Sequence, residues 1–278
     1  MSIILSSAIA SSLWSQATPS GDSEEEGDDL IQLSPFVVTE DESVGYAATS
    51  TLAGTRIKTE LKDLGAAISV VTPEFMEDTG ATNVEELFAY TTNTEVGGLQ
   101  GNFSAADLGA NSQRYNLDEQ RREPQSGTRI RGLSRPNFTR DYFSTSIPID
   151  AYNTGQITMN RGANSLLFGL GSAAGVVNAG LRRTVLSKNS GQVGFRFDQE
   201  GSYRAWVDYN QMIIPKRVAV RVDALAKEDV YKQDPAFDRE KRAYIAMDAI
   251  LLENENSRIF GPTTLRASYE IGAGKRTP

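Results

Sequence analysis

The sequence predicts an α+β domain followed by antiparallel strands of a transmembrane β-barrel. Three observations support this. Capped helical and β-branched segments occur between residues 57 and 183, four glycines crowd the stretch 160–178, and alternation of apolar and polar residues begins at residue 191. Long alternating strands with one apolar and one charged face are typical of a membrane barrel wall, although a soluble antiparallel sandwich gives the same alternation.

The composition removes several functional classes. The 278-residue chain has no histidine and no cysteine, so it cannot form disulfides, thiolate or imidazole metal sites, or a Ser-His triad. Its net charge of −8 argues against a nucleic-acid partner. We find no catalytic residue, metal-ligand set or cofactor motif, and an enzyme is not expected. A carboxylate-based hydrolase is an alternative, but no positioned pair of acids marks it.

The first 56 residues are predicted to be export and tether segments. Residues 1–17 are weakly apolar and end in small residues, Ser15 and Ala17, which predicts a partial signal peptide without its basic start; a disordered start is the alternative. Residues 18–56 are expected to be a flexible leader, because they open with an acidic run. Within this leader, Phe36–Glu40 is strand-like, and it is either an edge strand of the next domain or a donor strand for another protein.

Residues 57–127 predict a strand, two helices and a long irregular stretch. The strand covers 67–72, and a helix follows it with Thr72 as its cap and Pro73 in its first turn. A second helix over 82–90 carries the capping signal of Thr82 with Glu85. Its apolar residues Val84, Leu87 and Phe88 share one face. Residues 97–127 are either a surface for a small ligand or a solvated loop.

Residues 128–183 contain strands around a glycine-rich turn. The strand 128–133 places Ile130 inward between two arginines, and a second strand covers 156–160. The glycines from 169 to 175 are spaced G-x-G-x-x-x-G without Gly-Lys-Ser/Thr, and strand rather than helix follows them. This spacing argues against a nucleotide-binding loop.

From residue 191 onward, about five alternating strands of up to ten residues are expected, separated by polar turns. Five strands cannot close a barrel wide enough to hold a domain of over a hundred residues, and an open sheet edge cannot face lipid. We therefore expect the barrel to be incomplete and the chain to be truncated at its C-terminus.

Specific motifs resemble those of TonB-dependent outer-membrane receptors. Residues 128–133 (T-R-I-R-G-L) resemble the I-R-G element of that family's plug domain, and residues 157–169 resemble its V-E-V-L-R-G-P-x-S-x-L-Y-G signature. The following G-x-x-x-G-x-I-N pattern is matched by Gly171, Gly175, Val177 and Asn178. Residues 64–76 are similar to the plug's opening strand and helix, and residues 37–40 to the TonB box.

The resemblance assigns residues 36–40 to a TonB box, 57–183 to the plug and 191–278 to the first barrel strands. The TonB-box positions are Phe36, Val37, Val38, Thr39 and Glu40. The strand formed by this box would pair with an edge strand of the partner protein that supplies the energy, through main-chain hydrogen bonds.

The resemblance also implies roles for residues of the plug. The plug-signature positions are Arg129, Arg131, Gly132, Arg161, Gly162, Ser165, Gly169, Gly171, Gly175 and Asn178. The long plug loops would face the ligand, with Tyr115, Arg121, Arg122, Arg135 and Tyr142 as candidate contacts. The arginines at 129, 131 and 161 are expected to pair with carboxylates of the barrel lumen.

The sequence departs from the family pattern at several places. Ala163 replaces the usual proline, Asn160 a leucine and Thr158 a glutamate, and residues 141–152 do not spell the D-G-V/I turn. These departures leave the ligand class open.

As a function, the resemblance implies an outer-membrane receptor that binds a scarce nutrient, such as a ferric siderophore, cobalamin or an oligosaccharide. Import would use energy delivered by the inner-membrane TonB complex. Its partners would be TonB, the nutrient and outer-membrane lipid. The alternative is a secreted β-rich adhesin or glycan-binding protein.

Overall fold

The computed structural model describes residues 45–46, 48–53, 57–97, 124–162, 172–231, 236–252 and 263–277. All of them lie in one unit, Val37–Pro278. The predicted signal peptide lies outside the described residues, as does most of the stretch 97–127. No helix among the described residues is long and apolar enough to cross a membrane.

The predicted TonB box also lies outside the described residues, so its assignment stays a prediction. This holds for each of its five positions, Phe36, Val37, Val38, Thr39 and Glu40.

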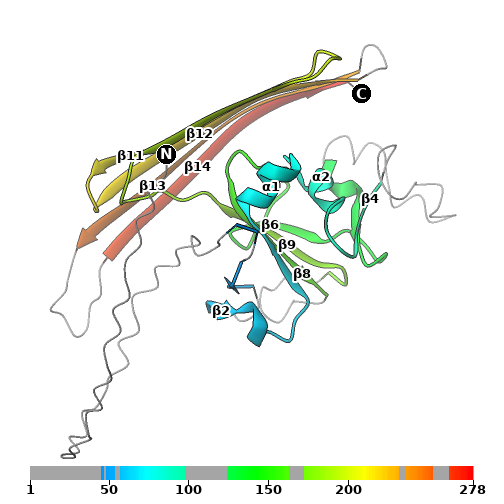
Figure 1. Ribbon diagram of the computed structural model, residues 1–278, viewed down its shortest axis with the longest axis horizontal. Helices are drawn as coiled ribbons and strands as arrows, with labels where there is room; N and C mark the ends of the chain where they lie inside the picture. Colours follow the sequence, from blue (N-terminus) through cyan, green and yellow to red (C-terminus); the bar gives the residue numbers. More distant parts are fainter. Residues whose placement is uncertain are drawn as a thin grey trace, which may run out of the picture. The chain divides into compact units, whose positions relative to one another are not determined.

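The first part, here called the α+β domain, covers the described residues up to 181 (Figure 1). Its elements are β1 (Ser50–Thr51), β2 (Thr59–Glu60), η1 (Leu61–Asp63), β3 (Ile68–Val71), α1 (Pro73–Thr79), α2 (Val84–Phe88), β4 (Thr94–Val96), η3 (Pro124–Gly127), β5 (Thr128–Ile130), β6 (Asn137–Arg140), β7 (Phe143–Ser144), β8 (Thr154–Arg161) and β9 (Gly175–Leu181).

A five-stranded sheet in the order β3-β8-β9-β6-β7 is the centre of this domain. The strands β6 and β9 are parallel, and the other neighbours are antiparallel. Two further pairs, β1-β2 and β4-β5, lie outside the sheet. The expected flexible leader 18–56 therefore contains a short paired strand, β1.

The two helices begin near the predicted positions. In α1, the Thr72 hydroxyl accepts a hydrogen bond from the Phe75 amide, and Pro73 is the first helical residue, as predicted. In α2 the cap is Asn83 rather than Thr82, and its side chain accepts from the Glu86 amide at 2.8 Å. The Glu86 carboxylate accepts from the amide and hydroxyl of Thr82. Asparagine caps at least as well as threonine, so the helix starts one residue later than predicted.

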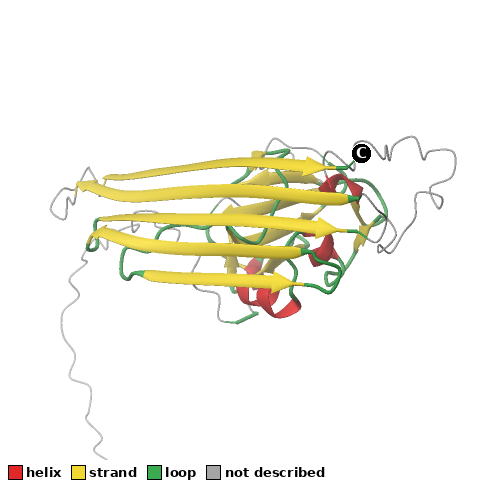
Figure 2. Ribbon diagram, turned by 90° about the horizontal axis from the view of Figure 1, so that it is seen from above, coloured by secondary structure: helices red, strands yellow, loops and turns green. Residues whose placement is uncertain are grey.

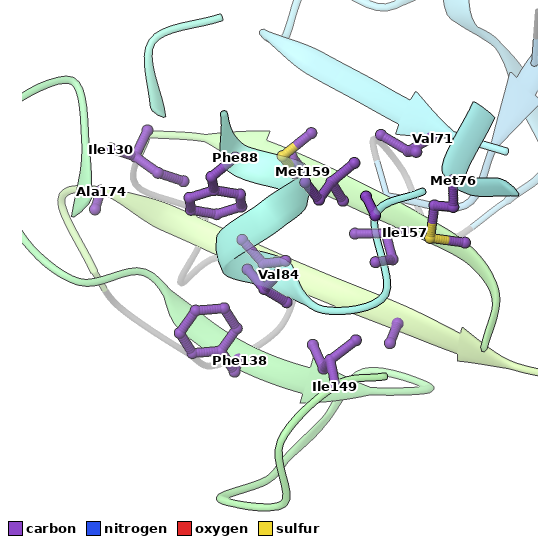
Figure 3. Packing of buried hydrophobic residues seen from close by; sticks show 14 residues of the cluster. Val71, Met76, Val84, Phe88, Ile130, Phe138, Ile149, Ile157, Met159 and Ala174 are labelled. Atoms are coloured by element: carbon purple, nitrogen blue, oxygen red, sulfur yellow. The ribbon is translucent and has the colours of Figure 1, made fainter. Parts of the chain in front are cut away.

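The apolar face of α2 packs on the sheet. The side chains of Val84, Leu87 and Phe88 are at most 1% exposed, as the helical spacing predicts. Figure 3 shows Phe88 and Val84 between residues of β5 and β6 and residues of β8. The buried cluster consists of Val71, Met76, Ala81, Val84, Leu87, Phe88, Ile130, Phe138, Ile149, Ile157, Met159, Ala174, Val177 and Ala179.

The second part is a five-stranded antiparallel meander, here called the wall sheet (Figure 2). Its strands are β10 (Ser190–Phe197), β11 (Tyr203–Ile214), β12 (Val218–Val230), β13 (Phe237–Leu252) and β14 (Thr263–Arg276). Neighbours pair in sequence order from β10 to β14, and the sheet is open. Residues 182–189, here called the linker, connect β9 to β10.

One face of the wall sheet exposes apolar side chains, and the other face buries charged side chains. On one face, Phe195 is 72%, Ile245 45% and Ile271 60% exposed. On the other face, Asp223 is fully buried and Arg242 is 6% exposed. A water-soluble sandwich would bury the apolar face instead, so this inversion favours the membrane-wall interpretation of the alternation.

The glycine-rich turn is tight at Gly175 rather than at Gly162. A Cβ on Gly175 would lie 1.9 Å from the Asn160 carbonyl oxygen, and its φ of +109° is unfavourable for other residues. At Gly162 the φ is +119°, but the nearest atom to an added Cβ would be the end of the Arg131 side chain, at 3.6 Å. Crowding therefore adds to conformational strain only at Gly175.

We predict that Gly175→Val destabilises the folded protein by more than about 2 kcal/mol, because the new side chain would collide with β8 in a strained conformation. Gly65→Ala is the matched control, since no atom lies within 4 Å of the added Cβ. Urea unfolding monitored by tryptophan fluorescence measures both. Equal stability of the two variants would contradict the close approach of β9 to β8.

Candidate functional site

The α+β domain contacts the wall sheet through buried ion pairs, and these form the candidate site. The Asp150 carboxylate, in the loop before β8, accepts two hydrogen bonds from the Arg204 guanidinium of β11, at 3.0 and 2.5 Å. Both side chains are at least nine-tenths buried. The Asp150 carboxylate also accepts from the Tyr152 amide at 2.9 Å, which fixes the turn. Such bidentate charged hydrogen bonds are among the strongest side-chain contacts.

The surroundings favour the ionised form of Asp150. Burial by itself raises the pKa of the carboxyl, but the charge and hydrogen bonds of Arg204 hold the pKa below its ordinary value. The carboxylate therefore stays charged throughout the physiological range and keeps Arg204 paired.

A second buried group joins β6 to β14. Arg140 pairs with Glu270, which also accepts a hydrogen bond from the Tyr152 hydroxyl at 2.6 Å. Burial, followed by the nearby charge of Arg242, lowers the pKa of Arg140 to about 10. The carbonyl of Pro148 accepts from both Arg140 (2.9 Å) and Arg242 (2.6 Å). One loop of the domain thus holds arginines from both sides of the contact.

The linker is fixed along β11–β13 by side chains of the wall sheet. The Asp208 carboxylate accepts from Arg182 at 2.9 Å and from Arg221 at 2.5 Å. The Thr184 hydroxyl donates to Asp248 at 2.6 Å. The Asn210 side chain accepts from the Val185 amide and donates to the carbonyls of Val185 and Lys188. Side chains of the wall therefore bond several backbone groups of the linker.

Two of the predicted signature arginines, Arg129 and Arg161, are bonded inside the α+β domain. Arg129 pairs with Glu95, its cross-strand neighbour on β4. The Arg161 guanidinium donates to the Ser69 hydroxyl at 2.6 Å, and burial, followed by the charge of Arg131, lowers its pKa. Arg140 and Arg182 form ion pairs with carboxylates of the described wall strands. Strand register places Arg129 directly opposite a carboxylate of β4. Pairing of the signature arginines with carboxylates of a complete barrel stays a prediction.

The strand β5 ends just before two of the plug-signature residues, Arg131 and Gly132. Arg131 and Gly132 have φ of 56° and 66°, so the chain leaves the extended conformation immediately after Ile130. The strand is three residues long rather than the six predicted.

Asn178 supports a tight turn between β6 and β7. Both turn residues, Asp141 and Tyr142, have left-handed φ of 45° and 67°, the geometry of a two-residue hairpin turn that usually contains glycine. The Asn178 side-chain oxygen accepts from the Tyr142 amide (2.7 Å) and the Thr139 hydroxyl (2.9 Å). Asp141 accepts from the Leu181 amide. These bonds compensate for the missing D-G sequence.

The candidate ligand contacts are only partly visible. Tyr115, Arg121 and Arg122 lie outside the described residues, as do the signature positions Ser165, Gly169 and Gly171. Arg135 precedes β6 and Tyr142 follows it, so these two lie at opposite ends of one strand. The ligand contacts stay a prediction.

Sequence reasoning missed Asp150, Arg140 and Arg182. The alternation of the wall strands does identify inward positions such as Arg204 and Asp208. Asp150 has no comparable signal, because it lies in a loop whose direction depends on tertiary contacts.

Comparison with known proteins identifies the first part of the chain. The family described as TonB-dependent Receptor Plug Domain matches residues 60–176. Residues 60–176 form a plug domain of the TonB-dependent receptor family. A comparison with curated proteins gives no match.

Solved receptors share the fold of the plug and the wall sheet. The ferripyoverdine receptor of the Pseudomonas aeruginosa outer membrane superposes with a TM-score of 0.66 and 18% identity, over 85% of this chain and 29% of that receptor. The alcaligin outer-membrane receptor FauA from Bordetella pertussis gives 0.65 and 19%, over 84% and 36%. The ferric-catecholate import receptor Fiu from Escherichia coli gives 0.59 and 17%, over 79% and 28%. The chain thus spans about a third of the length of these receptors.

We predict that Asp150→Asn destabilises the docked plug by about 3 kcal/mol or more, because it leaves the Arg204 charge buried and uncompensated. Since the folded-state pKa of Asp150 lies below the unfolded value of about 3.9, its stabilisation is complete above that value and is lost as the pH falls through the folded pKa. The two proteins should therefore converge in stability only below about pH 4.

Urea midpoints measured from pH 7 to pH 3 test this prediction. Glu228→Gln is the matched control, because it breaks the exposed Glu228–Arg239 pair of the same sheet and should change the midpoint little. A midpoint shift in Asp150→Asn no larger than in this control would show that the buried pair does not hold the plug.

Proposed function

We propose that the chain is the plug and the first barrel strands of an outer-membrane receptor that imports a ferric siderophore with energy from the TonB complex. The inverted wall sheet carries this proposal, because exposed apolar and buried charged faces suit a lipid-facing wall around a polar plug. Two of the solved receptors named above bind or import iron complexes, which favours ferric siderophores over cobalamin or oligosaccharides.

The same inversion disfavours the alternative of a secreted adhesin or glycan-binding protein. A soluble β-rich protein would expose Phe195, Ile245 and Ile271 to water at a high cost in free energy. It would also give no role to the segment 36–40.

The strand order supports an asymmetric response to force applied at residues 36–40. Along the chain, force would reach β1 and β2 and then β3. Among the strands that the structure describes, β3 is an edge strand that pairs with β8 alone, through four residue pairs. The other end of the plug leaves through the linker, which is held to three wall strands. Force would therefore loosen the N-terminal edge of the plug while β9 and the linker stay attached.

Membrane insertion tests the orientation of the wall sheet. In the full-length receptor with a closed barrel, we expect Ile245→Arg to weaken folding into lipid vesicles by about 2–4 kcal/mol, because the residue lies in the middle of the exposed apolar face. Gln192→Arg is the control, because Gln192 is the cross-strand neighbour of Asp208 on the polar face. A heat-modifiable band on electrophoresis measures folding. Equal effects of the two variants would contradict the assigned orientation.

Transport tests the role of the predicted TonB box. We expect Val38→Pro to abolish uptake of radiolabelled iron from a siderophore panel while leaving siderophore binding intact, because proline removes a main-chain donor from the paired strand. Val38→Ala keeps the amide and should retain uptake. Full uptake by the proline variant would refute the TonB-box assignment. Binding of cobalamin or an oligosaccharide alone would refute the ligand class.

A further inference from the structure

The outward face of the wall sheet gathers its charges at one end. Among the outward-facing positions of β10–β14, the charged side chains are Glu228, Arg239, Lys241 and Lys275. Cross-strand pairing places Glu228, Arg239 and Lys275 in one row, and Lys241 is the next outward residue on β13. This end of the sheet is opposite to the end at which the linker enters β10. We call Arg239, Lys241 and Lys275 the basic cluster.

The basic cluster is not neutralised by the protein. Glu228 binds the Arg239 guanidinium at 2.6 and 3.0 Å, which satisfies one of the three cations. Lys275 lies directly opposite Arg239, an arrangement of like charges that destabilises a sheet. In the part of the chain that the structure describes, neither Lys241 nor Lys275 forms an ion pair, and both are exposed. Two positive charges are left for an anion to bind.

The cluster adjoins the apolar band of the same face. Lys241 is paired with Ala226 and Ala273, and the next outward row is Ala224, Ala243 and Ile271. On the other side of the cluster, Phe237 lies under the Arg239 guanidinium, 5.8 Å from ring centroid to Cζ. Long cationic side chains beside apolar surface are suited to the level at which lipid headgroups meet acyl chains.

We propose that the basic cluster binds the phosphate of an anionic membrane lipid whose acyl chains lie along the apolar band. Only a lipid matches both features, because a soluble phosphate would make no use of the adjoining apolar rows. The proposal rests on the assignment of the wall sheet to a membrane. It adds a lipid-specific site to the nutrient site of the proposed receptor.

Native mass spectrometry of the full-length protein, purified in detergent, tests the site. The probes are phosphatidylglycerol and phosphatidylcholine with the same acyl chains. We expect tighter binding of phosphatidylglycerol, and a loss of about fivefold for each lysine removed, so on the order of 30-fold for Lys241→Gln/Lys275→Gln. Lys241→Arg/Lys275→Arg keeps the charges and should keep the affinity.

The matched control is Lys188→Gln/Lys216→Gln, which removes the same charge from exposed lysines at the linker end. An equal loss in this control, or unchanged affinity in the cluster variant, would overturn the proposal. Displacement of phosphatidylglycerol by millimolar inorganic phosphate would also overturn it, because the site would then be an anion site without lipid contacts.

Insertion into vesicles is measured on the same samples. Normal insertion without a preference for phosphatidylglycerol would contradict the lipid site alone. Failure of the unaltered full-length protein to insert would contradict the membrane assignment as well.

Discussion

The need to neutralise buried charge governs this structure. The inward face of the wall sheet carries aspartates, glutamates and arginines that lipid cannot solvate, and the plug supplies the opposite charges. Asp150 binds Arg204, Arg140 binds Glu270, and Arg182 binds Asp208. Because these ion pairs join the two parts, buried charges on each part depend on the other. Further charges of the wall, such as Arg242 and Glu240, pair within the sheet. The contacts that hold the plug are therefore polar, and they depend on the register of the strands.

These contacts are distributed unevenly over the plug. The loop 148–154, the linker and Arg140 of β6 carry most of the bonds to the wall, and Arg196 of β10 donates one to the Gly80 carbonyl after α1. The edge strand β3 is held by its pairing with β8 and by packing of Val71 in the core. The strand β3 contains no charged residue, so the ion pairs to the wall are made by other segments of the plug.

Much of the fold could be predicted from local patterns. The cap and proline of α1, the buried face of α2 and the five alternating wall strands follow from spacing that acts within a few residues. The predictions failed where two local signals competed. Thr82 and Asn83 could both cap α2, and the asparagine does so. Glycine spacing by itself does not show that the chain passes closest to β8 at Gly175.

The site was less predictable than the fold. Arg129 pairs with Glu95 across the short β4–β5 pair, which residue spacing does not reveal. Asp150 and Arg140 are separated from their partners on the wall by 54 and 130 residues. The sequence by itself therefore determined the class of protein, the order of its parts and the faces of its strands, because glycine spacing and period-two alternation are local properties. Only the tertiary structure decided which charges meet, because ion pairing depends on strand register and loop direction between distant segments.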